Sequence, residues 1–128
     1  MAKAATDPLT DPLTRVREIC LALPESSERL SHGSPSFFIR EKKTFTMFRD
    51  DHHGSGRVAI WCPAPSGVQE QMVEAEPERF FSPPYVGGRG WLGVHLDIEP
   101  DWGEVAGIVE EAFRHVAPKT VLRQLDRE

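Results

Sequence analysis

The sequence predicts an α+β domain, a two-layer sandwich in which helices pack mainly on one face of an antiparallel sheet. Three observations predict it: an amphipathic helical pattern near each end of the chain, a series of short alternating segments between residues 28 and 62, and another strand-like segment after residue 80. Consecutive strands joined by short turns pair as antiparallel neighbours. The predicted order is helix, three or four strands, helix, two strands, helix.

Size and composition fit one compact domain. With 128 residues, of which 39% are hydrophobic, the chain is long enough to bury a core. We expect residues 1–10 to form a flexible N-terminal extension and residues 11–128 a single domain. The net charge of −5 works against non-specific attraction to nucleic acid, so any such contact needs a local basic patch.

Cysteine content and hydropathy suggest a location. Cys20 and Cys62 lie beside apolar residues, and two cysteines cannot build a zinc cluster, so we expect reduced, buried thiols. The start of the sequence has no apolar segment of signal-peptide length, and no run approaches the roughly 18 apolar residues of a membrane span. We therefore expect a cytoplasmic protein that contacts no membrane.

The first element is a helix that begins after Asp11. Asp11 is a suitable N-cap, and Pro12 fits the first helical position. Apolar side chains then recur at steps of three and four residues, at Leu13, Val16, Ile19, Cys20 and Leu23. Pro24 ends this helix. The apolar stripe predicts that the helix packs against the sheet.

From Glu28 the apolar period changes to two, which is typical of strands. We expect strands at residues 29–32, 36–40, 44–49 and 57–62, with a charged turn at 41–43 and a polar loop at 50–56. Together they predict an antiparallel meander. In the third strand, alternation places Phe45 and Met47 on one face and Thr44, Thr46 and Phe48 on the other.

The second half of the chain contains two further helices and the remaining strands. A short helix is expected at residues 68–75, between prolines. The prolines, glycines and aromatics of residues 80–90 argue against a helix there. They lead into a strand at 91–97 with Leu92, Val94 and Leu96 on one face. A capping box at Asp101 and Glu104 starts the clearest helix of the chain, and Pro118 restarts a last turn or two.

In this order of elements the sequence resembles the MmcQ/YjbR family. The resemblance rests on Ala-Leu-Pro at 22–24, Lys-Thr-Phe at 43–45, Pro-Pro-Tyr-Val at 83–86, Gly90-Trp91 and Val-Ala-Pro-Lys at 116–119, and it covers residues 12–126. It implies a small bacterial protein with a CyaY-like or secretion-chaperone-like two-layer fold, of a kind described as predicted DNA-binding. It supplies no catalytic residues.

A nucleic-acid interface is the first functional hypothesis. Basic residues concentrate in the strand half of the chain, at Arg40, Lys42, Lys43, Arg49, Arg57, Arg79 and Arg89. A hairpin with Lys42 and Lys43 at its tip could reach the phosphates of double-stranded DNA. The candidate contacts are Arg40, Lys42, Lys43, Arg57, Arg89 and, as a stacking or packing residue, Trp91. Such binding should weaken steeply as salt rises.

The alternative hypothesis is a module that binds a protein partner, a second copy of itself or a small ligand. It would use the sheet face and a pocket formed by Tyr85, Arg89, Trp91 and His95. The glycines around Arg89 allow the backbone to approach an anion, but they also suit a purely architectural turn. Whether Arg89 points outward or holds the turn against the sheet separates the two interpretations.

Neither a metal site nor a catalytic motif is recognisable. Asp51-His52-His53, like the pair His95 and Asp97, supplies too few convergent ligands for zinc or iron, so we expect no metal and no cofactor. No serine or cysteine has a neighbouring base that would activate it. We therefore expect a protein that is not an enzyme.

Overall fold

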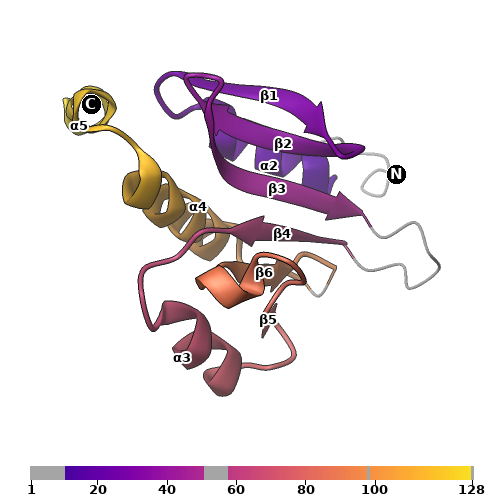
Figure 1. Ribbon diagram of the computed structural model, residues 1–128. Coiled ribbons are helices and arrows are strands. Elements are labelled where there is room, and N and C mark those ends of the chain that lie inside the picture. The colour runs from indigo at the N-terminus through magenta and orange to yellow at the C-terminus, as the bar shows by residue number, and fades with distance from the viewer. Residues whose placement is uncertain (1–10, 51–57, 98, 128) are drawn as a thin grey trace.

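A computed structural model describes residues 11–50, 58–97 and 99–127 (Figure 1). The elements are α2 (Pro12–Leu21), β1 (Ser26–Ser31), β2 (Ser34–Ile39), β3 (Lys43–Asp50), β4 (Val58–Cys62), α3 (Val68–Ala75), β5 (Phe80–Phe81), the 3₁₀ turn η2 (Gly87–Arg89), β6 (Leu92–His95), α4 (Trp102–Val116) and α5 (Lys119–Asp126). This order confirms the predicted α+β class. The expected extension at residues 1–10 lies outside the described residues.

One antiparallel sheet of six strands forms the middle of the molecule, in the order β1-β2-β3-β4-β6-β5. Strands β1 to β4 form the predicted meander, and β6 enters between β4 and β5. Helices α2 and α4 lie behind the sheet in Figure 1. The opposite side is called the outer sheet face, and the register assigns to it Ser27, Arg29, Ser36, Phe38, Met47, Arg49, Ala59, Trp61, Gly93 and His95.

The predicted assignment of β3 side chains to the two sheet faces is wrong because the strand contains a bulge. Phe37 pairs with Thr46, but the next residue, Phe38, pairs with Thr44, so Phe45 is an extra residue without an opposite partner. A bulge breaks the period of two. Consequently Phe45 and Phe48 both enter the core, and Met47 is directed to the outer sheet face.

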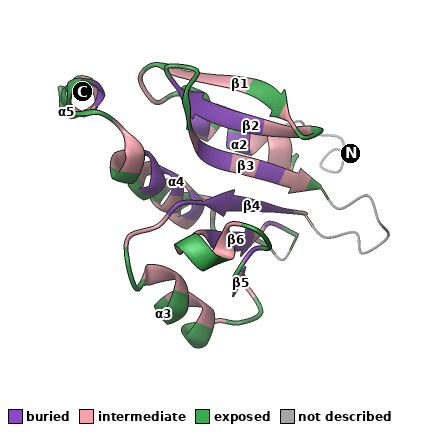
Figure 2. Cartoon of the chain, viewed as in Figure 1, coloured by how far each residue is buried: buried purple, intermediate pink, exposed green. Residues whose placement is uncertain are grey.

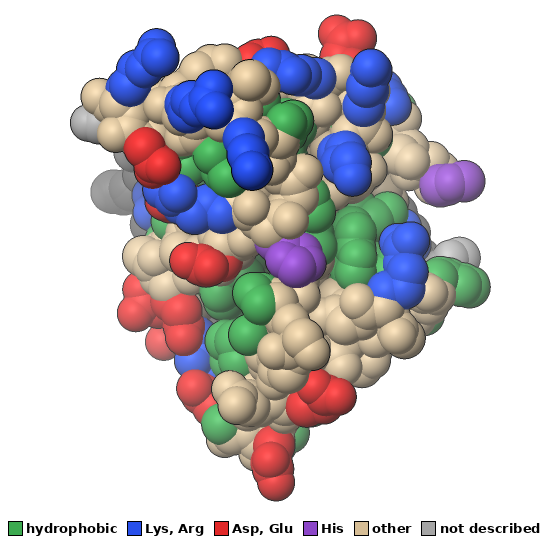
Figure 3. All heavy atoms as spheres, turned by 60° about the vertical axis from the view of Figure 1, so that its left-hand side comes forward, with side chains coloured by type: hydrophobic (Ala, Val, Ile, Leu, Met, Phe, Trp, Pro, Cys, Tyr) green, Lys and Arg blue, Asp and Glu red, His purple; other side chains and the backbone are tan. Residues whose placement is uncertain are grey.

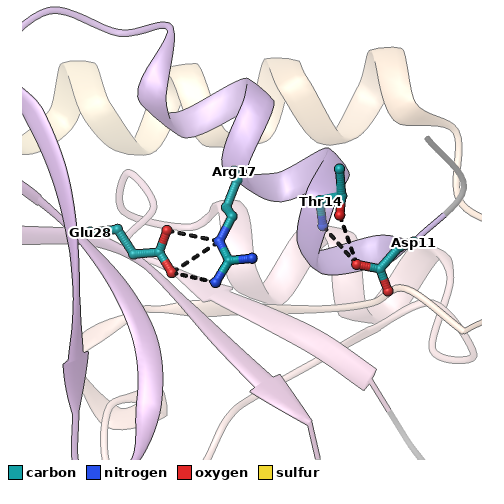
Figure 4. Close-up of polar contacts among 4 residues, drawn as sticks. All are labelled: Asp11, Thr14, Arg17 and Glu28. Carbon is teal, nitrogen blue, oxygen red and sulfur yellow. Dashed lines mark hydrogen bonds and ion pairs between the residues drawn. The ribbon is translucent and has the colours of Figure 1, made fainter. Parts of the chain in front are cut away.

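Polar contacts cap the start of α2 and join the helix to β1 (Figure 4). The Asp11 carboxylate accepts hydrogen bonds from the backbone N–H of Thr14, at 3.1 Å, and from its hydroxyl, at 2.9 Å. This is the predicted N-cap, which typically stabilises a helix by about 1 kcal/mol. Two turns along, Arg17 donates to both oxygens of Glu28 on β1. Helix and edge strand are thereby fixed together.

The core lies between the sheet and helices α2 and α4, where buried residues concentrate in Figure 2. The predicted cap of α4 is present, since Asp101 accepts from the backbone N–H of Glu104. The buried stripe of α4 includes Phe113, whose ring meets Phe45 edge-on at 5.2 Å. Leu92, Val94 and Leu96 enter the same core, as alternation predicted. Burying each such side chain contributes about 1.5–3 kcal/mol.

Both cysteines are buried in this core as free thiols, as expected. Desolvation raises the pKa of Cys62 to about 12 and also raises the pKa of Cys20. The Thr46 hydroxyl lies 3.7 Å from the Cys62 sulfur. Because only a thiolate is a good nucleophile, thiols of this kind are chemically inert at neutral pH.

Candidate functional site

The glycine-rich connection between β5 and β6 is a closed turn. The backbone N–H groups of Gly87, Arg89 and Gly90 donate to carbonyls within the segment, at 2.8 to 3.0 Å. Gly90 has a φ of +88°, which a residue with a side chain adopts only at a cost. Since these amides are already used inside the turn, they cannot cradle an anion. The contacts support the architectural interpretation of this segment.

Gln69 of α3 holds the turn in place. Its side-chain amide donates to the carbonyl of Gly87, at 2.9 Å, and to the carbonyl of Trp91. One side chain therefore satisfies both ends of η2. Sequence reasoning missed this residue because nothing in the helical pattern of α3 distinguishes one polar position from another.

Arg89 is exposed and does not hold the turn. Its guanidinium carbon lies 5.8 Å from the centre of the Trp91 ring, so it covers one side of a half-buried indole. Tyr85 is 93% exposed and has a φ of +68°. Tyr85 and Arg89 thus face solvent on the connection between β5 and β6.

His95 belongs to a different arrangement from Tyr85. The Phe81 ring stacks on the His95 imidazole at 4.5 Å and lies across Gly93. A Cβ atom added at Gly93 would lie only 2.4 Å from a carbon of that ring. Gly93 is therefore needed for Phe81 to cover the end of the sheet. Of the four residues of the alternative hypothesis, Arg89 lies beside Trp91, whereas His95 lies beside Phe81.

The β2–β3 hairpin contains three of the predicted DNA contacts, and they differ in availability. Arg40 pairs with Glu25 at 2.9 Å and donates to the Thr120 hydroxyl of α5 at 2.9 Å, so its charge is compensated and its position fixed. Lys42 and Lys43 are exposed. Within the described residues neither lysine has an ion-pair partner. Arg57 lies outside the described part of the chain.

Two further arginines stand on the outer sheet face, each above a ring. The Arg29 guanidinium carbon lies 3.8 Å from the centre of the Phe38 ring, and that of Arg49 lies 4.5 Å from the centre of the Trp61 ring. Arg29 also donates to the carbonyl of Glu41 at 3.1 Å. Arg29 could not be selected from the sequence, because its aromatic neighbour Phe38 lies on the adjacent strand rather than nearby in the chain.

Arg79 is not available to a ligand in the same way. It pairs with Glu76 at 2.8 Å and with Glu104 of α4, and it is only 26% exposed. Hydrogen bonds to these two carboxylates raise its pKa. Arg79 therefore joins the segment before β5 to α4.

Charge is divided between the two ends of the molecule. In Figure 3 the Lys and Arg side chains gather mostly over the upper half, at the height of β1 to β3 and α5. Asp and Glu side chains predominate toward the bottom, where α3 lies. Helix α3 and the turn after it contain Glu70, Glu74, Glu76 and Glu78, against the single cation Arg79. A chain with net charge −5 thus still presents a basic end.

The side-chain positions of the described residues do not support a metal site. Among the described residues, no three His, Cys, Asp or Glu side chains are grouped so as to hold an ion. Asp51, His52 and His53 lie outside those residues. Likewise, no helix in the described ranges combines the length and apolar character that a bilayer crossing requires.

Comparison with known proteins agrees with the architecture. The YjbR family model matches residues 21–115. The chain belongs to the YjbR family. Among solved structures it is similar to the crystal structure of Deinococcus radiodurans protein DR2400, which has a DUF419 domain, with a TM-score of 0.72 and 16% identity over 93% of this chain and 90% of that one. That likeness shows the YjbR fold. No curated protein matches the sequence.

Proposed function

We propose that this YjbR-family chain is a cytoplasmic, non-enzymatic protein that binds the phosphate backbone of double-stranded DNA. The interface is the outer sheet face together with the β2–β3 hairpin. The observation that supports this most directly is the pair of guanidinium groups, Arg29 and Arg49, held over rings on that face.

The stacked geometry makes these two arginines suitable for phosphates. A guanidinium on an aromatic face gains about 0.5–1 kcal/mol at an exposed site, and its planar donors remain at the edge of the group. Less rotamer freedom is then lost when a phosphate binds. The rings beneath are only 5% and 7% exposed, so bases cannot stack on Phe38 or Trp61. The proposed contact is therefore with the DNA phosphate backbone and has little sequence preference.

The spacing of the cations suits a duplex. Arg29 and Arg49 lie two strands apart, about 10 Å, and are offset by two residues, about 7 Å. Their separation is thus about 12 Å, comparable to the width of a B-DNA groove. Lys42 lies in the turn beyond the strand ends and extends the basic surface there, and Lys43 opens β3 opposite Ile39. Glu41 and Asp50 oppose it, which keeps the predicted affinity modest.

The absence of enzymatic function is part of the same proposal. Both thiols are buried and, with raised pKa values, stay protonated at neutral pH. Cys20 and Cys62 therefore serve the core. The cations of the proposed interface bind phosphate without activating a nucleophile.

Fluorescence anisotropy with a labelled duplex tests the proposal. Arg49→Gln should weaken binding about threefold to tenfold and lower the slope of log affinity against log salt by about 1. Arg15→Gln is the matched control, because Arg15 also lies over a ring, that of Trp102 at 5.3 Å, but on α2 at the helical side of the sheet. Its affinity should stay at the wild-type value.

Two results would overturn the proposal. One is no binding to the duplex at about 50 mM salt, where the electrostatic contribution is strong. The other is an equal loss of affinity in Arg15→Gln and Arg49→Gln, since that would locate the contact elsewhere or make it a general charge effect.

A second candidate function, self-association or pairing with a protein partner, is favoured by the β1 edge. β1 is six residues long, pairs only with β2 among the described residues, and exposes 70% of Leu30. An open edge with an exposed apolar side chain can add a strand from another chain. Sedimentation velocity would detect a dimer, and Leu30→Lys should dissociate it. A monomer at all concentrations, with no partner strand bound, would exclude this function.

A further inference from the structure

A pocket of about 540 Å³ lies between α3 and α4, away from the outer sheet face. It is open to solvent and falls within the size range of small-molecule sites. The wall from α4 is a single helical stripe, and the opposite wall comes from α3 and the segment after β4. The lining residues are Pro63, Ala64, Pro65, Val68, Met72, Leu92, Glu104, Gly107, Ile108 and Glu111.

Gly107 shows that this space is left open by the sequence. A glycine inside a helix destabilises it relative to alanine, and Gly107 sits in the middle of α4. A Cβ atom added there would meet no atom within 4 Å, and its φ is not in the left-handed region. Neither packing nor backbone conformation requires glycine. Gly107 is exposed, and the open space above it belongs to the solvent-open side of the pocket, into which a side chain at this position would extend.

The polar groups of the pocket are carboxylates at its two ends. Glu104 and Glu111 are two turns apart on α4, about 10 Å. Glu104 already pairs with Arg79, whereas no ion pair in the described part of the chain involves Glu111. The remaining lining is apolar, and prolines 63 and 65 have no backbone N–H to offer an anion. A complementary ligand therefore has an apolar body and one cationic group.

We propose that the pocket between α3 and α4 binds a small organic cation, an amine or guanidine on an apolar aliphatic or aromatic body. Glu111 pairs with the cationic group, and the body lies over Gly107 between Ile108 and Met72. This site is independent of the DNA interface, because it shares no residue with the outer sheet face or the hairpin.

NMR chemical-shift titration of the full chain tests this, with phenylbutylamine as the probe. Phenylbutanol and phenylbutyrate are controls of similar shape, one neutral and one anionic. The amine should perturb amides of α3, α4 and residues 66–68, and should bind at least about tenfold more tightly than either control. Glu111→Gln should remove most of that preference while leaving the weak binding of the alcohol unchanged.

Gly107→Leu tests the position of the ligand. Leucine is a strong helix former, so the variant should remain folded and gain stability, yet its side chain fills the pocket. Amine binding should fall at least tenfold. Gly107→Ala is the matched control, because it gives the same helical benefit with only one added carbon, and it should retain binding within about threefold.

Three outcomes would overturn the proposal. They are equal affinity for the amine, the alcohol and the carboxylate; wild-type amine affinity in a folded Gly107→Leu; and no saturable amine binding below about 10 mM. A failure of DNA binding would leave these readouts unchanged, since the two sites are separate.

Discussion

The outer sheet face and the α3–α4 pocket differ in what surrounds their charged groups. On the outer sheet face, Arg29 and Arg49 lie on aromatic rings, which position a cation without neutralising it. Beside the pocket, Arg79 also lies over a ring, that of Phe80 at 4.9 Å, but it pairs with two carboxylates and is neutralised. We infer that the partner of an arginine, more than its exposure or the net charge of the chain, decides whether the arginine can bind a ligand. The two regions should therefore respond differently to salt.

The largest difference between the two sites is expected in how their binding affinities depend on salt. Four phosphate contacts, from Arg29, Arg49, Lys42 and Lys43, would give a slope of about −3.6, so raising salt from 50 to 200 mM should lower duplex affinity about 10²-fold. Amine binding in the pocket rests on one partly screened ion pair and apolar contact, and should fall less than about threefold. Anisotropy and NMR titrations at both salt concentrations measure this. Equal salt dependence at both sites would erase the distinction.

Alkaline pH tests the core that both regions share. The folded chain keeps the Cys62 proton up to a pH of about 12, while the unfolded chain releases it near 9.0. Burial of the protonated Cys62 thiol therefore gives its full stabilisation below pH 9. Above pH 9 the free energy of unfolding falls by about 1.4 kcal/mol per pH unit, or roughly 3 kcal/mol by pH 11. Urea titrations should show this fall. Cys62→Ala should be less stable at pH 7 but have a shallower dependence above pH 9; an unchanged slope would contradict the assignment.

Gly93→Ala tests the packing at the end of the outer sheet face. The added methyl group collides with the Phe81 ring, which must leave its position against His95. A loss of about 1–3 kcal/mol is expected in urea unfolding. Gly88→Ala is the control, since a Cβ atom there meets nothing within 4 Å, and it should be within about 0.5 kcal/mol of wild type. Equal effects of the two changes would show that Phe81 adapts freely.

Gly107→Ala should change stability the least, and it should raise stability where the other changes lower it. With no atom within 4 Å of the new methyl group, the helix gains propensity and nothing is displaced. Stability should rise by about 0.5–1 kcal/mol, seen as a higher urea midpoint with an unchanged slope. A loss of stability would mean that the pocket closes onto Gly107 in solution.

The sequence predicted elements better than their assembly. Helices α2 and α4 could be recognised because caps such as Asp11 and an apolar stripe are local features of the chain. The bulge at Phe45 could not, because it depends on the register with β2. The insertion of β6 between β4 and β5 likewise has no local sign.

The same limit applies to the candidate sites. The exposure of Lys42 and Lys43 could be predicted, since a charged turn is visible in the sequence. Arg29 over Phe38 and Gln69 under η2 bring together residues from different elements. The pocket also forms only when α3 and α4 are placed side by side. Contacts of this kind appear only once the chain is folded.

The position of β6 has a kinetic consequence. Strands β1 to β4 pair with neighbours in sequence, whereas β6 reaches β4 only after residues 63–91 have closed into a loop. Loop closure carries an entropic cost that local hairpins largely avoid. We expect the meander to form early and β6 to join late and open first, which native-state hydrogen exchange would show as weaker protection of Val94 than of Phe37. Equal protection would indicate a single cooperative unit. The segment richest in family motifs is then the last part of the sheet to assemble.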